Sequence, residues 1–154
     1  MKKSLLSLAL CLFLTLTWAQ NKTAPQSPET TANVKSLLIS KDYAFTPTVF
    51  YMKSRKVRQS VKAVAFLRVK ANKARVKLPV EQSAHIEFSG DLLNYKLRNL
   101  SSNQFEVTFS VKNDRNVIDV RLVSIASDHF TMELTTNSNQ EMVYIGQISK
   151  YSSK

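Results

Sequence analysis

The chain has 154 residues, with 22 lysines and arginines against 11 aspartates and glutamates and a net charge of +11. Its one cysteine, Cys11, excludes an intramolecular disulfide, so the fold must be held by its hydrophobic core. This length suits one domain.

The first residues have the order of an export signal. Two lysines precede an apolar run over residues 5–16, and Thr17-Trp18-Ala19 follows. The run is short for a bilayer span, which predicts cleavage between Ala19 and Gln20 and no transmembrane anchor afterwards. The mature chain would carry 20 cationic and 11 acidic side chains, a net charge of +9. We therefore expect an exported protein, periplasmic or secreted.

Residues 20–36 are predicted to be a flexible linker that leads into a short helix. Their Thr, Ala, Pro, Ser, Asn and Lys content cannot bury much apolar surface. Ser27 is a candidate helix cap and Pro28 suits a first helical position, while Val34, Leu37 and Leu38 fall at helical spacing. Residues 37–150 are expected to form a single β-rich domain.

From residue 43 onward apolar and polar residues alternate, which is typical of strands with one wet face. Short turn sequences, such as Ser89-Gly90-Asp91, separate the runs and favour antiparallel neighbours. The pattern predicts a mostly β fold, an antiparallel meander of about nine strands that curls into a barrel-like sheet, with a β-sandwich as the alternative. Because only Gly90 and Gly146 are available for sharp bends, incomplete closure is expected. The expected strands cover residues 43–52, 63–71, 74–78, 86–88, 93–97, 105–111, 118–122, 130–134 and 142–148.

Three phrases carry a family resemblance. SKDYAFTPTVF follows the predicted helix, FLRVKANKARVKLP forms a candidate hairpin, and VYIGQI closes the domain. Together with the export signal they resemble the exported Bacteroidota proteins catalogued as domain of unknown function 4251, over roughly residues 36–149. The resemblance implies a single exported β-rich domain with no assigned reaction.

Few residues point to chemistry. His85 and Glu87 share a strand face, and Asp128 and His129 adjoin a turn, so a metal site is a minor alternative. The chain has no G-x-S-x-G elbow and no Gly-rich phosphate loop. We expect no catalysis, no cofactor and no metal site. The alternating aromatic residues Tyr95, Phe105, Phe109 and Phe130 fit a filled core better than a ligand cavity.

Residues 53–77 contain ten basic residues and no acidic one. A two-residue turn at Asn72-Lys73 would place Lys70 opposite Arg75 and Arg68 opposite Lys77 on an outer face, where like charges repel. Glu87 is the candidate acid beside Arg75 and Lys77. The run is either a solvated face or an anion-binding surface. The candidate anion-binding residues are Lys53, Arg55, Lys56, Arg58, Lys62, Arg68, Lys70, Arg75 and Lys77.

The expected export limits the choice of partner. Nucleic acid is not expected, since no recognition helix or stacking motif is visible. Anionic lipid headgroups, lipopolysaccharide and acidic glycan are the candidate partners in a bacterial envelope. The favoured hypothesis is a non-catalytic binding module with a basic outer face. The alternative is a carrier of a small apolar ligand inside a partly open barrel.

Overall fold

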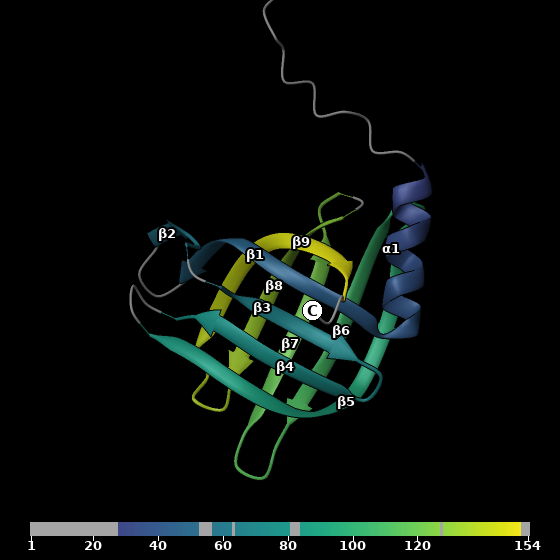
Figure 1. The fold of residues 1–154 in the computed structure, drawn as a ribbon. Helices are drawn as coiled ribbons and strands as arrows, with labels where there is room; N and C mark the ends of the chain where they lie inside the picture. The colour runs from purple at the N-terminus through teal and green to yellow at the C-terminus, as the bar shows by residue number, and fades with distance from the viewer. Residues whose placement is uncertain (1–27, 53–56, 63, 81–83, 127, 152–154) are drawn as a thin grey trace, which may run out of the picture.

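The computed structural model describes residues 28–52, 57–62, 64–80, 84–126 and 128–151. One helix is followed by strands that wrap around a common interior (Figure 1). The elements are α1 (Pro28–Ser40), β1 (Asp42–Met52), β2 (Val57–Ser60), β3 (Phe66–Lys70), β4 (Lys73–Pro79), β5 (His85–Ser101), β6 (Gln104–Lys112), β7 (Val117–Ser124), β8 (His129–Thr136) and β9 (Glu141–Lys150).

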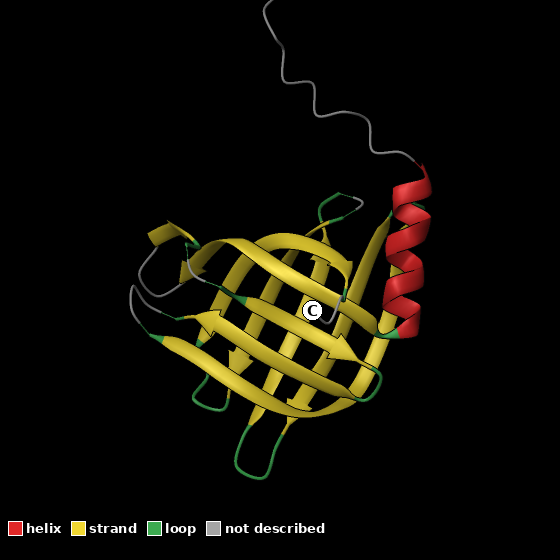
Figure 2. Ribbon diagram, in the orientation of Figure 1, coloured by secondary structure: helices red, strands yellow, loops and turns green. Residues whose placement is uncertain are grey.

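The strands form an antiparallel meander that closes on itself. Neighbours pair in the order β2-β1-β3-β4-β5-β6-β7-β8-β9, and β1 also pairs with β9. Eight strands therefore make a closed barrel, and β2 adds one more beside β1 (Figure 2). The mostly β, nine-stranded, curled meander is confirmed. The expected incomplete closure is wrong, because β1 bonds to β3 on one side and to β9 on the other.

One long strand replaces two predicted short ones. The sequence placed a turn at Ser89-Gly90-Asp91, whereas β5 runs through it without a break. A Cβ on Gly90 would lie 2.6 Å from the Lys112 carbonyl carbon, so this glycine serves a close approach of β5 to β6. A bulge at Asn94, whose φ is 56°, then reverses the alternation, which leaves Leu92 buried and Leu93 exposed.

The β3–β4 hairpin turns one residue earlier than predicted. Its loop is Ala71-Asn72, and Leu67 faces Val76 while Val69 faces Ala74. Ala71 takes a left-handed conformation with φ 53°, and its N–H donates to the Lys41 carbonyl. This bond to a distant residue helps to fix the register. The predicted turn at Asn72-Lys73 rests on local residue preference alone, which does not include such a contact. The shift keeps the paired residues of both strands on their predicted faces, but Ala71, expected to pair with Ala74, lies exposed in the loop.

Large side chains fill the barrel interior. Tyr43, Phe45, Phe105, Phe130 and Tyr144 are almost completely buried along with many aliphatic residues. Phe109 is buried and Tyr95 is partly buried against the same cluster, as the filled-core prediction expected.

The predicted helix is confirmed as α1, which stands beside the barrel (Figure 1). Val34 and Leu38 insert into the core, and the Tyr95 hydroxyl donates to the Leu38 carbonyl at 2.8 Å. Among the described residues no helix is long and apolar enough to cross a membrane.

Candidate functional site

The outer face of β3 and β4 is cationic, because in both strands basic residues alternate with apolar residues that face the core. Alternate residues of both strands, such as Val69 and Val76, are buried in the core. The residues between them must then point outward. The outward cations of these two strands are Arg68, Lys70, Lys73, Arg75 and Lys77.

Like charges lie opposite each other across this hairpin. The structure pairs Arg68 with Arg75 and Lys70 with Lys73, which replaces the two predicted pairings. Each directly opposed like-charge pair destabilises a sheet by about 0.2–1 kcal/mol. The stacking of cations expected from the sequence is therefore present, with different partners.

Strand β5 neutralises part of this charge. Lys73 pairs with Asp91, and Arg75 Nη2 lies 2.6 Å from Glu87 Oε1. Lys77 faces Glu87 across the strands, which confirms the predicted place of that acid. The hydrogen bond from Arg75 and the charge of Lys77 lower the pKa of Glu87.

Two cations have no carboxylate partner among the residues that the structure describes. Arg68 and Lys70 make no ion pair and donate no side-chain hydrogen bond within that part of the chain. Asp42 faces Lys70 in the β1–β3 register, but its buried Oδ1 accepts no hydrogen bond from a described residue. This corner of the face therefore keeps unpaired donors.

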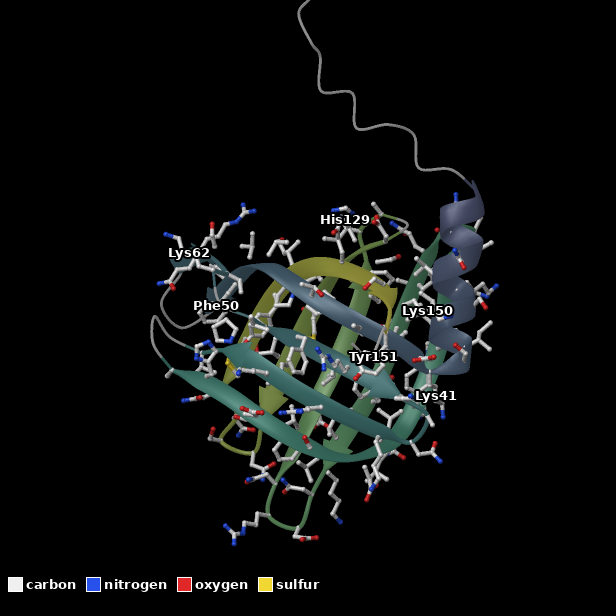
Figure 3. The ribbon with its side chains drawn as sticks, in the orientation of Figure 1. Lys41, Phe50, Lys62, His129, Lys150 and Tyr151 are labelled. Atoms are coloured by element: carbon white, nitrogen blue, oxygen red, sulfur yellow. The ribbon has the colours of Figure 1, made fainter. Side chains whose placement is uncertain are left out.

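Two aromatic rings contact the Arg68 guanidinium. Its Cζ lies 4.0 Å from the centroid of the Phe66 ring and 5.0 Å from that of Tyr151. Lys70 Nζ lies 5.8 Å from the Tyr151 centroid. Such contacts stabilise cations over ring faces. Figure 3 shows Tyr151, which follows β9, over the outside of the barrel near β3.

Tyr151 closes one side of a surface hollow of about 350 Å³, which we call the basic hollow. It is lined by Arg68, Lys70, Lys73, Ala74, Arg75, Ser89, Gly90 and Tyr151. Sequence reasoning found three of its cations. It missed Lys73, because that residue lies in the predicted turn, and it missed Tyr151, which lies beyond the last predicted strand.

The other predicted cations lie apart from this hollow or outside the described residues. Lys53, Arg55 and Lys56 belong to residues 53–56, which the structure does not describe. Arg58 on β2 and Lys62 just after it are exposed. In Figure 3, Lys62 lies at the β2 end of the barrel, well separated from Tyr151. Among the described residues the basic run thus forms at least two groups, of which the β3–β4 group has five cations and the β2 group has Arg58 and Lys62.

A second hollow of about 350 Å³ lies over β5, β6, β7 and β8 and carries charges of both signs, with Lys96 of β5 among its lining residues. Arg121 donates to Glu106 at 2.8 Å and to Glu133 at 3.0 Å, and these bonds raise the pKa of the Arg121 guanidinium. Ser110 donates to Asp119 at 2.6 Å. Its charged groups are thus mostly paired, and Lys96 is the one lining cation without an ion pair among the described residues, whereas the basic hollow has two.

The candidate metal ligands do not assemble. His129 Nδ1 bonds to Asp128 Oδ1 at 2.7 Å, and its Nε2 lies 3.1 Å from the Gln147 amide nitrogen. His85 lies at the start of β5, beside Pro79. No group of three His, Cys, Asp or Glu residues in the described part of the chain could hold a metal ion.

Comparisons with known proteins agree with this fold. No curated protein matches the chain. A crystal structure of a DUF4251 family protein from Bacteroides eggerthii DSM 20697 superposes with a TM-score of 0.68, at 11% sequence identity, over 79% of this chain and 88% of that chain. The family described as "Domain of unknown function (DUF4251)" matches residues 26–148. The chain therefore belongs to the DUF4251 family, as the resemblance of its sequence phrases indicated.

Proposed function

We propose that this protein is an exported, non-catalytic binding module that holds an anionic component of the cell envelope on the outer face of β3 and β4. The supporting observation is that two pairs of like charges face each other across the hairpin, Arg68 with Arg75 and Lys70 with Lys73. Of these four, only Lys73 and Arg75 pair with a carboxylate of a described residue. An anion bound at this face would offset the repulsion that the register creates.

The expected location of the protein limits the classes of partner. If the leader is removed between Ala19 and Gln20, the domain works outside the cytoplasm, where anionic lipid headgroups, lipopolysaccharide and acidic glycans are abundant and nucleic acid is not. Their shared chemistry is phosphate or carboxylate groups on a surface. Arginine and lysine on one sheet face suit both groups.

A carrier of a small apolar ligand is the second candidate. It requires free space inside the barrel, and buried aromatic side chains such as Tyr43, Phe105 and Phe130 occupy that interior. The described hollows of about 350 Å³ both lie on the outer surface. The filled interior favours surface binding over internal carriage.

The test is a double charge reversal, Arg68→Glu with Lys70→Glu. Each new glutamate would lie opposite a cation, Arg75 or Lys73, which offsets the Asp42 that faces position 70 and the lost Arg68 contact with Phe66, so we expect the variant to fold. The matched control, Lys96→Glu with Arg115→Glu, has the same net charge at exposed positions on other parts of the barrel.

Retention is measured on vesicles with and without anionic lipid and on immobilised heparin, over a series of salt concentrations. We expect the wild type and the control to be retained, with retention falling steeply as salt rises, and the β3–β4 variant to pass through. Equal loss in both variants would mean that net charge alone causes retention, and the face would be merely solvated.

A further inference from the structure

The basic hollow has the donors of a discrete anion site, beyond a general positive potential. The rings of Phe66 and Tyr151 lie over the Arg68 guanidinium at 4.0 and 5.0 Å. These contacts involve ring faces and no hydrogen bond, and none of the five Arg68 N–H donors is used by a described residue, so they remain available to a ligand. The two ring contacts also limit the side chain's rotation, which lowers the entropy that a ligand must remove.

The surrounding donors outnumber the acceptors. Lys70 offers an ammonium group, and the hydroxyls of Tyr151 and Ser89 make no hydrogen bond with any described residue. Two of the three nearby carboxylates are engaged, Asp91 by Lys73 and Glu87 by Arg75, and the third, Asp42, faces Lys70 from β1 with its Oδ1 buried. A ligand that fits must therefore bring several acceptor oxygens on one small group.

The charge balance sets the charge of that group. Five outward cations of β3 and β4 stand against three nearby acids, Asp42, Glu87 and Asp91, which leaves an excess of two positive charges. A phosphate monoester carries about −1.5 to −2 charge at neutral pH and three terminal oxygens. A carboxylate carries one charge and two oxygens, and a phosphodiester also carries only one charge.

We infer that the basic hollow binds a terminal phosphate monoester, with the Arg68 guanidinium and the Lys70 ammonium holding its oxygens. This inference rests on the proposed function and names the anion that the face selects. The volume of about 350 Å³ is at the small end of ligand sites, so it admits the phosphate and a sugar- or glycerol-sized group beside Tyr151. Gly90 and Ala74 line it without adding bulk.

The experiment is calorimetric titration of the exported chain with glucose 6-phosphate, glucuronate and glucose. We expect saturable binding of glucose 6-phosphate, about tenfold tighter than that of glucuronate, and none of glucose. Arg68→Lys keeps the charge but loses the planar fork, and should weaken glucose 6-phosphate about tenfold. Arg115→Lys, the same change at an exposed arginine between β6 and β7, should have no effect.

A vesicle arm separates the two sources of such a phosphate. Phosphatidic acid presents a monoester, and phosphatidylglycerol, matched in surface charge, presents a diester. Preference for phosphatidic acid without glucose 6-phosphate binding would assign the site to a lipid headgroup, and the reverse would assign it to a phosphorylated sugar. Either outcome supports a phosphate monoester as the ligand of the basic hollow.

Two results would overturn the inference: equal affinity for glucose 6-phosphate and glucuronate, or indistinguishable Arg68→Lys and Arg115→Lys variants. Neither result argues against the proposed function, because Arg68→Lys leaves the charge of the β3–β4 face unchanged. If anionic vesicles are still retained through Arg68 and Lys70 but neither monoester binds selectively, the discrete site is wrong and the basic surface stands. If the charge-reversal variant also binds vesicles like the wild type, both are wrong.

Discussion

Barrel closure depends on one glycine, and replacing it tests the fold directly. Gly146 of β9 faces Pro47 of β1 beside a register shift, and a Cβ there would overlap the Thr46 carbonyl oxygen and lie 2.7 Å from Pro47 Cα. Carbon atoms in contact are normally about 3.5–4.0 Å apart. Gly146→Ala must therefore push β1 and β9 apart by about 1 Å, against backbone that no side-chain rotation can move.

We expect this change to lower the free energy of unfolding by about 2–3 kcal/mol, from overpacking and weakened β1–β9 hydrogen bonds. With a urea dependence of about 1–3 kcal/mol per molar, the unfolding midpoint should fall by roughly 1–2 M. Far-ultraviolet circular dichroism is the suitable probe, because Trp18, the chain's one tryptophan, lies in the predicted leader. Ser149→Ala, at an exposed position of the same strand, is the control. Equal midpoints for the two variants would refute closure of the barrel at β1 and β9.

Three further predictions concern the hairpin, the phenols and the leader. Val76→Asp, at a completely buried position, should cost more than about 4 kcal/mol, whereas the neighbouring Lys77→Ser should stay within about 0.5 kcal/mol; similar losses would mean that the strand faces are misassigned. Burial raises the pKa of Tyr95 to about 12 and those of Tyr43 and Tyr144 above their ordinary range, so the folded state favours neutral phenols. Stability should then be complete below about pH 10 and be lost as pH rises towards 12, which urea unfolding along a pH series would show; a flat profile contradicts buried phenols. Mass spectrometry of the exported protein should give Gln20 as its first residue, and a retained Met1 would disprove cleavage after Ala19.

The strand pattern was predictable wherever one face is buried and the other wet. Phe105, Val107, Phe109 and Val111 of β6 lie on the inner face, as their alternation requires. The pattern failed at β5, because Gly90 is as typical of a turn as of a close strand contact, and the Asn94 bulge moved Leu93 to the outside. Only the neighbouring strand decides between these alternatives.

The candidate site was half predictable for a similar reason. The cations of β3 and β4 stand in one stretch of sequence, and their outward direction follows from the buried residues between them. Tyr151 reaches them only because β9 pairs with β1, which in turn pairs with β3. Nothing in the alternation near residue 151 indicates a ring over Arg68, since that contact depends on closure of the whole barrel.

The fold itself explains some of these cations better than others. Arg68 covers Phe66, an outward ring that remains only 9% exposed, so its apolar stem has a structural reason to be there. Lys73 and Arg75 have acidic partners on β5. Lys70 makes no salt bridge with a described residue; its neighbours are the Tyr151 ring at 5.8 Å, Asp42 on β1 and Lys73 on β4, which carries the same positive charge. A threonine would suit that exposed strand position without the repulsion. Because the Tyr151 ring and Asp42 form no ion pair with Lys70, these contacts explain its charge less well than an anion bound outside the barrel would.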